Sequence, residues 1–129
     1  MAVYVDSSAI VKLAVREPES AALRRYLQRK APLVASALAR AEVLRALLPA
    51  GEEAVARGRS VLQRFDLLRI NDRVLNEAGA LLPAELRTLD AIHLAAARRL
   101  GDDLRALVTY DSRMAEAATQ LDYRVVSPG

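Results

Sequence analysis

The sequence predicts an α/β domain in which a central parallel β-sheet of four to five short strands is flanked by helices. Short apolar runs alternate along the chain with amphipathic segments of helical period, and parallel strands need such crossover helices. The chain has 129 residues and is 53% hydrophobic, which is enough for one domain with a real core and too little for two. We therefore expect a single domain over residues 1–129.

The first element is a strand at residues 2–5. Its run AVYV has no polar break, which is typical of a strand that is buried on both faces of a parallel sheet. Asp6 ends the strand, and Ser7 and Ser8 offer N-cap hydroxyl groups to a helix whose apolar positions begin at Ile10. Asp6 thus lies where a strand passes into a helix, the edge at which open α/β sheets build their sites. The alternative is that Asp6 is only a helix cap.

The next segments repeat this order. Residues 21–30 have the spacing of an amphipathic surface helix, and residues 33–35 predict a second short strand with Ser36 after it as a helix cap. Residues 37–48 then predict a helix with one broad apolar face. The main side chains of that face are Leu38, Ala41, Leu44 and Leu48.

A tight turn at residues 49–51 joins this helix to another at residues 52–65, so we expect an αα-hairpin. Gly58 weakens the middle of the second helix. The rest of the chain continues to alternate between strands and helices. These elements are a strand at 66–70, a helix from 71–72 to 82, a helix at 89–100 capped by Thr88, a strand at 106–109, a helix at 112–121 and a last strand at 123–126.

Composition and charge exclude several classes of protein. There is no cysteine, so neither a disulfide framework nor a thiolate zinc site is available. No apolar run approaches the roughly 20 residues of a membrane span, and no signal segment is present, so we expect a soluble, unprocessed, cytoplasmic protein. The net charge is +3 and arginine supplies 17 of the 19 positive charges, which suits phosphate contacts. With four Tyr, one Phe and no Trp, aromatic side chains are too few for a base-stacking platform.

Four carboxylates from separate segments are the candidate catalytic and metal-binding residues: Asp6, Glu42, Asp90 and Asp111. Asp111 follows the fourth strand as Asp6 follows the first, so both reach the same edge of the sheet. Ser8 and Thr109 stand beside them as hydroxyl partners. Asp90 lies in the first turn of its helix, where the dipole favours a negative charge. An all-oxygen set of this kind favours Mg²⁺ or Mn²⁺ over zinc and is typical of phosphoryl transfer.

Each of these residues also has a purely structural interpretation. Asp90 lies at the margin of a predicted buried stripe and could serve only to complement the helix dipole. That stripe consists of Leu89, Ile92, His93, Ala96 and Leu100. Glu42 has the spacing for a surface ion pair with Arg45. A lone histidine at His93 is more often a hydrogen-bonded core residue than a ligand.

The segments VDSSAIVKL, ALARAEVLRAL, RTLDAIHLAAA and LVTYDSRMAEAA, in this order, resemble the PIN-domain ribonucleases and most closely the VapC-type toxins of prokaryotic toxin–antitoxin pairs. The resemblance covers essentially the whole chain. It implies a PIN-like fold and a metal-dependent endoribonuclease, with Mg²⁺ or Mn²⁺ bound by the four acids and Ser8 and Thr109 as supporting hydroxyls. It also implies RNA as the substrate, a cognate VapB-like antitoxin and a homodimer. Some relatives place a further acid after the fourth, for which Glu116 is the only candidate.

Other functions on a similar sheet are less consistent with the residues present. A haloacid-dehalogenase-like phosphatase needs a second Asp two residues after the first, where this chain has Ser8, and a receiver domain needs an acid pair at the end of the first strand. The alternative within the resemblance is a catalytically inactive PIN-like domain that binds RNA or acts as a scaffold. Such a relative would be expected to have replaced one of the four acids, and all four are present.

Overall fold

The computed structural model describes residues 1–129 and contains a five-stranded sheet with the strand order β3-β2-β1-β4-β5. All pairs of neighbouring strands are parallel, which confirms the predicted fold class. The strands are β1 (Ala2–Val5), β2 (Leu33–Ser36), β3 (Asp66–Leu68), β4 (Leu104–Val108) and β5 (Val125–Val126). Because the strands are parallel, their carboxyl ends meet at one edge of the sheet.

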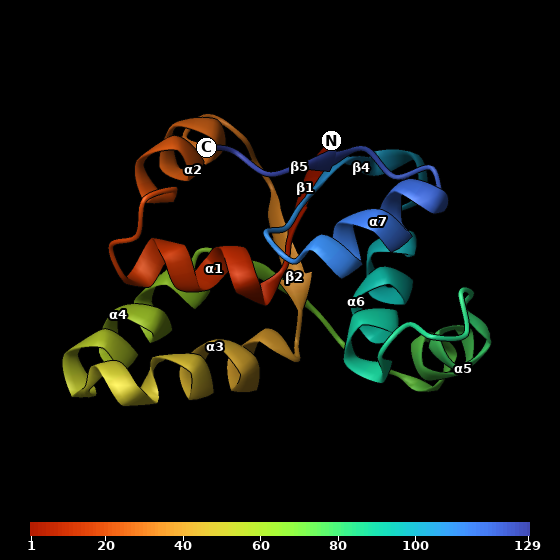
Figure 1. Ribbon diagram of the computed structural model, residues 1–129, viewed down its shortest axis with the longest axis horizontal. Helices are drawn as coiled ribbons and strands as arrows, with labels where there is room; N and C mark the ends of the chain where they lie inside the picture. The colour runs from red at the N-terminus through yellow and green to blue at the C-terminus, as the bar shows by residue number, and fades with distance from the viewer.

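Helices cover both faces of the sheet, as Figure 1 shows, with α1, α3 and α4 on one side and α5, α6 and α7 on the other. The helices are α1 (Ser7–Ala14), α2 (Ser20–Leu27), α3 (Ala39–Leu47), α4 (Glu52–Leu62), α5 (Asp72–Ala80), α6 (Thr88–Arg98) and α7 (Ser112–Gln120). Short 3-10 turns follow α3 (Leu48–Ala50) and precede β4 (Gly101–Asp103). None of the helices combines the length and the apolar character that crossing a membrane requires.

The central strand β1 is buried on both faces, as its apolar run predicts. Successive side chains of a strand point to opposite faces. Val3 and Val5 accordingly pack into the core formed with α1 to α4, whereas Ala2 and Tyr4 pack into the core formed with α5 to α7. The strand that carries Asp6 at its end is therefore held from both sides.

Several helix starts differ from the prediction by one or two residues. The side chain that caps α1 is Asp6 and not Ser7 or Ser8. Helix α6 begins at Thr88 itself, and no side chain makes a cap hydrogen bond there. Ser36 is the last residue of β2, and its hydroxyl accepts a hydrogen bond from the N–H of Leu38 (3.0 Å), the residue just before α3 begins.

The predicted buried face of α3 is correct only in part, because Leu38 and Leu44 are half-buried against the core clusters but do not form the fully buried row. The buried residues are Ala39, Val43 and Leu47, which repeat every four residues along one row of the helix. Ala41 is exposed and Leu48 is 55% exposed. The helix packs against both α1 and α4, which also contact each other, and this arrangement, which the sequence alone does not give, selects the buried row.

The buried stripe of α6 is also wider than predicted. All residues from Ala91 to Ala97 are buried, because the helix is packed against the sheet and α5 at once and small alanine side chains let the neighbours approach. Leu89, in contrast, is 49% exposed. The edge of the stripe therefore lies between Leu89 and Ala91, and Asp90 stands at that edge.

Gly58 in α4 has a packing role. A Cβ atom at this position would lie 2.5 Å from Cδ1 of Leu47 and 3.3 Å from Cδ2 of Leu44. The absence of a side chain thus lets α3 and α4 approach closely, which offsets the helix-weakening effect that the sequence predicts. The expected αα-hairpin is confirmed.

Candidate active site

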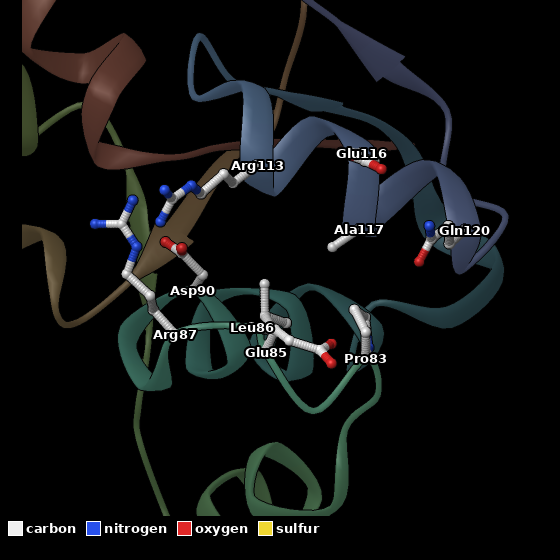
Figure 2. A pocket seen from close by; sticks show the side chains of 9 residues that line it. All are labelled: Pro83, Glu85, Leu86, Arg87, Asp90, Arg113, Glu116, Ala117 and Gln120. Atoms are coloured by element: carbon white, nitrogen blue, oxygen red, sulfur yellow. The ribbon is translucent and has the colours of Figure 1, made fainter.

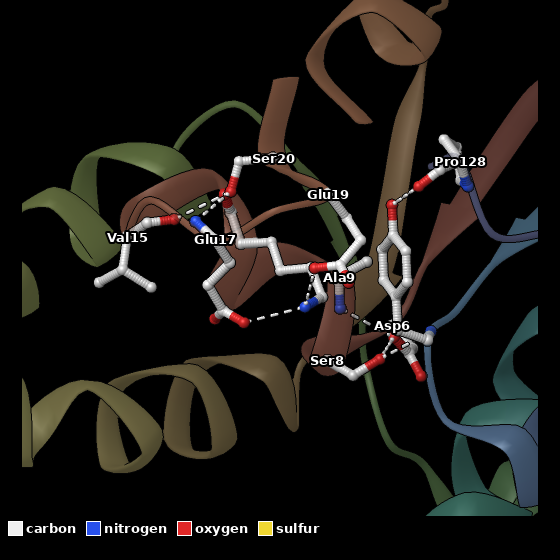
Figure 3. Close-up of polar contacts among 10 residues, drawn as sticks. Asp6, Ser8, Ala9, Val15, Glu17, Glu19, Ser20 and Pro128 are labelled. Atoms are coloured by element: carbon white, nitrogen blue, oxygen red, sulfur yellow. Dashed lines mark hydrogen bonds and ion pairs between the residues drawn. The ribbon is translucent and has the colours of Figure 1, made fainter. Parts of the chain in front are cut away.

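Asp6 lies at the carboxyl end of β1 and is only 3% exposed. As the N-cap of α1, its carboxylate accepts a hydrogen bond from the backbone N–H of Ala9 (3.1 Å). It also accepts hydrogen bonds from the hydroxyl groups of Ser8 (2.6 Å) and Thr109 (2.5 Å). Figure 3 shows Ser8 and Ala9 reaching the carboxylate from the first turn of α1. The cap interpretation is correct, but three donors on one buried carboxylate are more than a cap requires.

The hydroxyl groups of Ser8 and Thr109 join the end of β1 to the end of β4. Besides donating to Asp6, Ser8 Oγ accepts a hydrogen bond from the N–H of Tyr110 (3.1 Å), and Thr109 Oγ1 accepts one from the N–H of Asp111 (3.0 Å). Each hydroxyl thus uses its proton on the carboxylate and a lone pair on the backbone. This network fixes the orientation of Asp6 and links it to the segment that carries Asp111.

Glu42 is the acid contributed by α3, and its side chain is 26% exposed. Its Oε1 accepts a hydrogen bond from Ser7 Oγ (2.8 Å) and lies 2.6 Å from Nε2 of His93. Because a carboxylate can only accept, Nε2 of His93 is the donor in this contact, and Nδ1 of the same ring lies 2.8 Å from the hydroxyl oxygen of Tyr4. The predicted alternative, an ion pair between Glu42 and Arg45, is not formed.

Burial and hydrogen bonding shift the pKa values of these two carboxyl groups in opposite directions. Burial raises the pKa of Asp6 above its usual 3.8, and the hydroxyls of Ser8 and Thr109 counteract this only in part. Burial also acts to raise the pKa of Glu42. The hydrogen bond and charge of His93, with the hydroxyl of Ser7, outweigh it, so the pKa of Glu42 lies below its usual value. Glu42 is therefore ionised at neutral pH.

Asp90 and Asp111 approach the same edge of the sheet from α6 and α7. Asp111 is the N-cap of α7 and accepts hydrogen bonds from two backbone N–H groups of the next turn (2.9 and 3.3 Å). Burial is the main cause that raises the pKa of Asp90, and the negative charges of Asp111 and Asp6 raise it further. Arg87 and His93 act on it in the opposite direction. The carboxylates of Asp6, Asp90 and Asp111 thus lie within electrostatic range of one another.

The acidic side chains suit the expected ion in chemical type but not in spacing. No three of the acidic and histidine side chains converge closely enough to bind one metal ion. Both carboxylate oxygens of Asp6 and Oε1 of Glu42 accept hydrogen bonds from neighbouring hydroxyl and imidazole groups instead. In chemical type, however, every candidate donor is a carboxylate oxygen, and the mutual repulsion at Asp90 is what a divalent cation would relieve. The donor set therefore fits Mg²⁺ or Mn²⁺.

The structure brings three residues to this site that sequence reasoning did not assign to it. His93 is a buried, hydrogen-bonded core residue, as predicted, but it also binds Glu42. Ser7 binds Glu42 directly and Tyr4 binds His93. One signal was available, because His93 lies three residues after Asp90 and is the only polar side chain between Ala91 and Ala97.

A cavity of about 500 Å³ lies beside Asp90, between α7 and the segment that leads into α6 (Figure 2). Glu116, the candidate for a further acid, lines this cavity from α7. Arg113 lies one turn earlier on the same helix, and Arg87 lines the cavity just before α6 begins. Sequence reasoning singled out neither arginine.

Three comparisons place this arrangement among known proteins. The PIN domain family model matches residues 3–120. Ribonuclease VapC46 of Mycobacterium tuberculosis (strain ATCC 25618 / H37Rv) is 65% identical over 127 residues, which are 98% of each chain. Ribonuclease VapC35 of the same strain is 42% identical over 131 residues, covering 98% of this chain and 97% of that protein.

Solved structures of similar fold have lower sequence identity. The crystal structure of Mycobacterium tuberculosis VapC20, described as a sarcin-ricin loop cleaving toxin, has a TM-score of 0.78 and 16% identity and covers 98% of this chain and 99% of that one. A toxin–antitoxin complex from Klebsiella pneumoniae has a TM-score of 0.74 and 22% identity, with 98% of both chains covered. VapBC2 from Rickettsia felis, bound to a promoter DNA fragment, has a TM-score of 0.73 and 12% identity over the full length of both chains.

Proposed function

Because the chain belongs to the PIN-domain family, we propose that it is a VapC-type toxin, an endoribonuclease that hydrolyses RNA phosphodiester bonds and is neutralised by a cognate VapB-like antitoxin. The observation that carries this proposal is the 65% identity to a ribonuclease over 98% of both chains. The match spans almost the whole chain, and it therefore includes the segments that carry the candidate acids. We place its action in the cytoplasm, where cellular RNA substrates are found.

We assign catalysis to the four carboxylates predicted from the sequence: Asp6, Glu42, Asp90 and Asp111. Asp6, Asp90 and Asp111 would hold one or two Mg²⁺ or Mn²⁺ ions, with Glu42 as a further ligand or as the group that orients the attacking water. A divalent ion bound there supplies polarisation of the phosphodiester and a lower pKa for bound water. In-line attack would leave 5'-phosphate and 3'-hydroxyl ends, and no side chain needs to act as nucleophile.

The protein's own contribution to this chemistry is to position the carboxylates. Ser8 and Thr109 hold the Asp6 carboxylate from two directions, so its orientation is set before substrate arrives. Glu42 is held in the same way by Ser7 and His93. Since His93 and Tyr4 are both buried, water does not compete for the hydrogen bond between them, which orients the imidazole ring towards Glu42.

Replacing His93 with Phe is expected to lower kcat at least about tenfold with little change in KM, because a hydrogen bond to a charged group is worth about 1.5–3 kcal/mol. His93→Gln, which can still donate to Glu42, should restore part of the loss. Tyr4→Phe removes only the outer hydrogen bond of His93 and should have the smallest effect. Steady-state kinetics with thermal melting checks this. If His93→Phe lowers only the melting temperature, His93 is a core residue without a role in positioning Glu42.

We also propose a homodimer. Exposed apolar surface supports it: in the helical hairpin at residues 37–65, Leu48 is 55% exposed. More of this surface lies around α5 and α6, where Leu75, Leu82 and Leu89 are 46%, 70% and 49% exposed. Light scattering at micromolar concentration should give about twice the 14.1 kDa of one chain. A mass near 14 kDa would contradict the proposal.

Two solved toxin–antitoxin complexes each contain a chain whose fold is similar to that of this protein, and this similarity supports an antitoxin as its partner. The carboxylates make this edge of the sheet a region of negative potential. An arginine or lysine of the antitoxin could therefore neutralise the site by inserting its charge among them, and arginine is better suited because its planar group can engage two carboxylates.

Mapping of RNA ends tests the proposed function. The chain and its Asp6→Asn variant are expressed separately, and new 5'-phosphate ends in total RNA are sequenced. We expect discrete cleavage sites with the natural chain and none with the variant. Equal patterns of RNA ends in both cultures would contradict catalysis at Asp6, and the absence of new ends in both would favour the inactive RNA-binding alternative.

A further inference from the structure

The cavity beside Asp90 has a positively charged end and a mixed remainder. Arg87 and Arg113 belong to different elements, and Figure 2 shows both guanidinium groups turned towards the end of the cavity where the Asp90 carboxylate lies. Pro83 and Gln120 line it farther from Asp90. Its volume of about 500 Å³ falls within the range of roughly 300–1,000 Å³ that is typical of small-ligand sites.

Both arginine side chains keep their hydrogen-bond donors free. Neither forms an ion pair, and neither donates a side-chain hydrogen bond. Lys12, also near the ends of β1 and β4, differs because Glu17 and Glu19 each bind its ammonium group at 2.9 Å. The cations available to an incoming anion at the Asp90 end of the cavity are therefore those of Arg87 and Arg113.

We propose that Arg87 and Arg113 bind the RNA backbone phosphate next to the bond that is cut, and that the cavity holds the nucleotide attached to that phosphate. The inference rests on the proposed ribonuclease function and assigns it a substrate subsite.

Charge gives the physical reason for such a subsite. A chain of phosphates that approaches Asp6, Asp90 and Asp111 is repelled by their negative charges unless fixed cations compensate. The guanidinium group is planar, stays charged and binds phosphate through two parallel hydrogen bonds. Two guanidinium groups from different parts of the chain can bind one phosphate from two sides. The neighbouring phosphodiester is then fixed in position relative to the carboxylates.

The cavity lining suits a nucleotide better than an apolar ligand. Leu86 and Ala117 offer apolar surface, the carboxylates of Glu85 and Glu116 can accept hydrogen bonds from a base, and the amide of Gln120 can donate or accept them. A base can pack on the former and form hydrogen bonds with the latter, and hydrogen bonds to the edges of unstacked bases are one part of how single-stranded RNA is read.

The test uses Arg87→Gln, Arg113→Gln and, as a matched control, Arg105→Gln. Arg105 is an exposed arginine near the start of β4, at the opposite end of that strand from the site. KM is measured on a short single-stranded RNA. Affinity is measured as a function of salt with Asp6→Asn added to every protein, so that the RNA stays intact. Thermal melting checks that each protein is folded.

Each cavity variant is expected to raise KM about tenfold and to reduce the slope of log affinity against log salt by up to about 0.7, the value of one phosphate contact on a single strand. Arg105→Gln should match the natural chain in both measurements. If the natural chain and the cavity variants have the same KM and the same slope of log affinity against log salt, the arginines do not bind phosphate and the inference is overturned. If the natural chain does not cleave RNA, the proposed function itself fails.

A scan with abasic RNA tests the cavity. One base at a time is removed along the oligonucleotide, and affinity is measured again with the Asp6→Asn protein. We expect a loss of affinity at one position next to the cleavage site. Equal affinity at every position would overturn the assignment of a nucleotide to the cavity.

Discussion

The variant Asp6→Asn is expected to cleave RNA at least about 100-fold more slowly than the natural chain, which corresponds to about 2.7 kcal/mol of lost transition-state stabilisation. Asn retains the size of the side chain but removes the negative charge that we assign to ion binding. The other acids cannot replace it, because Asp6 is held at the junction of β1 and β4 by its own set of donors.

The same variant should be as stable as the natural chain or more stable. Burial raises the folded-state pKa of Asp6 above the usual 3.8, so keeping it ionised at neutral pH costs free energy of folding. This cost is fully present above the raised pKa and fades as the pH falls towards 3.8. The difference in melting temperature between variant and natural chain should therefore shrink between neutral pH and pH 3.8.

A control for these measurements is Asp66→Asn. Asp66 is an exposed acid at the start of β3, away from the edge that carries the candidate acids. It should change neither the cleavage rate nor the melting temperature appreciably, since exposed substitutions usually shift stability by about 0.5 kcal/mol or less. If Asp6→Asn instead unfolds the chain, the helix-cap role of Asp6 is its main one and its assignment to catalysis loses its support.

Chelation of divalent cations should abolish cleavage completely. With EDTA present we expect no RNA cleavage, and addition of Mg²⁺ or Mn²⁺ in excess should restore it, because all of the proposed ligands are carboxylates. Added Mg²⁺ should also raise the melting temperature. Binding at 100 times the dissociation constant stabilises a protein by about 2.7 kcal/mol.

This thermal shift should be smaller in Asp6→Asn and unchanged in Asp66→Asn. The comparison separates binding at the acids from a general effect of salt on the charged surface. Cleavage that persists in EDTA would show that the reaction does not depend on the cation, and the assignment of the four carboxylates as metal ligands would then be wrong.

The fold could be predicted because its main determinants are local in the sequence. Each buried parallel strand appears as a short apolar run, Asp6 follows such a run directly and Asp111 follows another after two residues, so the shared sheet edge places both acids. The buried face of α3 could not be predicted in the same way. Its apolar side chains surround much of the helix, and the contacts with α1 and α4 decide that Val43 is buried and Ala41 is not.

The hydrogen bonds that His93 makes in the site could not be predicted from the sequence either, because they join residues far apart in the chain. Tyr4 and His93 are 89 residues apart in the chain, and Glu42 and His93 are 51 apart. No periodicity links such positions, because their meeting depends on how α3 and α6 are placed on the sheet. A role for Arg87 could not be predicted for another reason. The chain has 17 arginines, and only the cavity in the structure distinguishes Arg87 from the other exposed ones.

The strand order has a consequence for how activity arises during synthesis. Strand β1 is made first but pairs with β4, whose residues begin at Leu104. A nascent chain that has not reached this point has no Thr109 to orient Asp6 and no Asp111 at all. Contacts of such long sequence separation form late in folding. Incomplete chains on the ribosome should therefore be harmless to nearby RNA, and toxicity should begin only after nearly the whole chain has been translated.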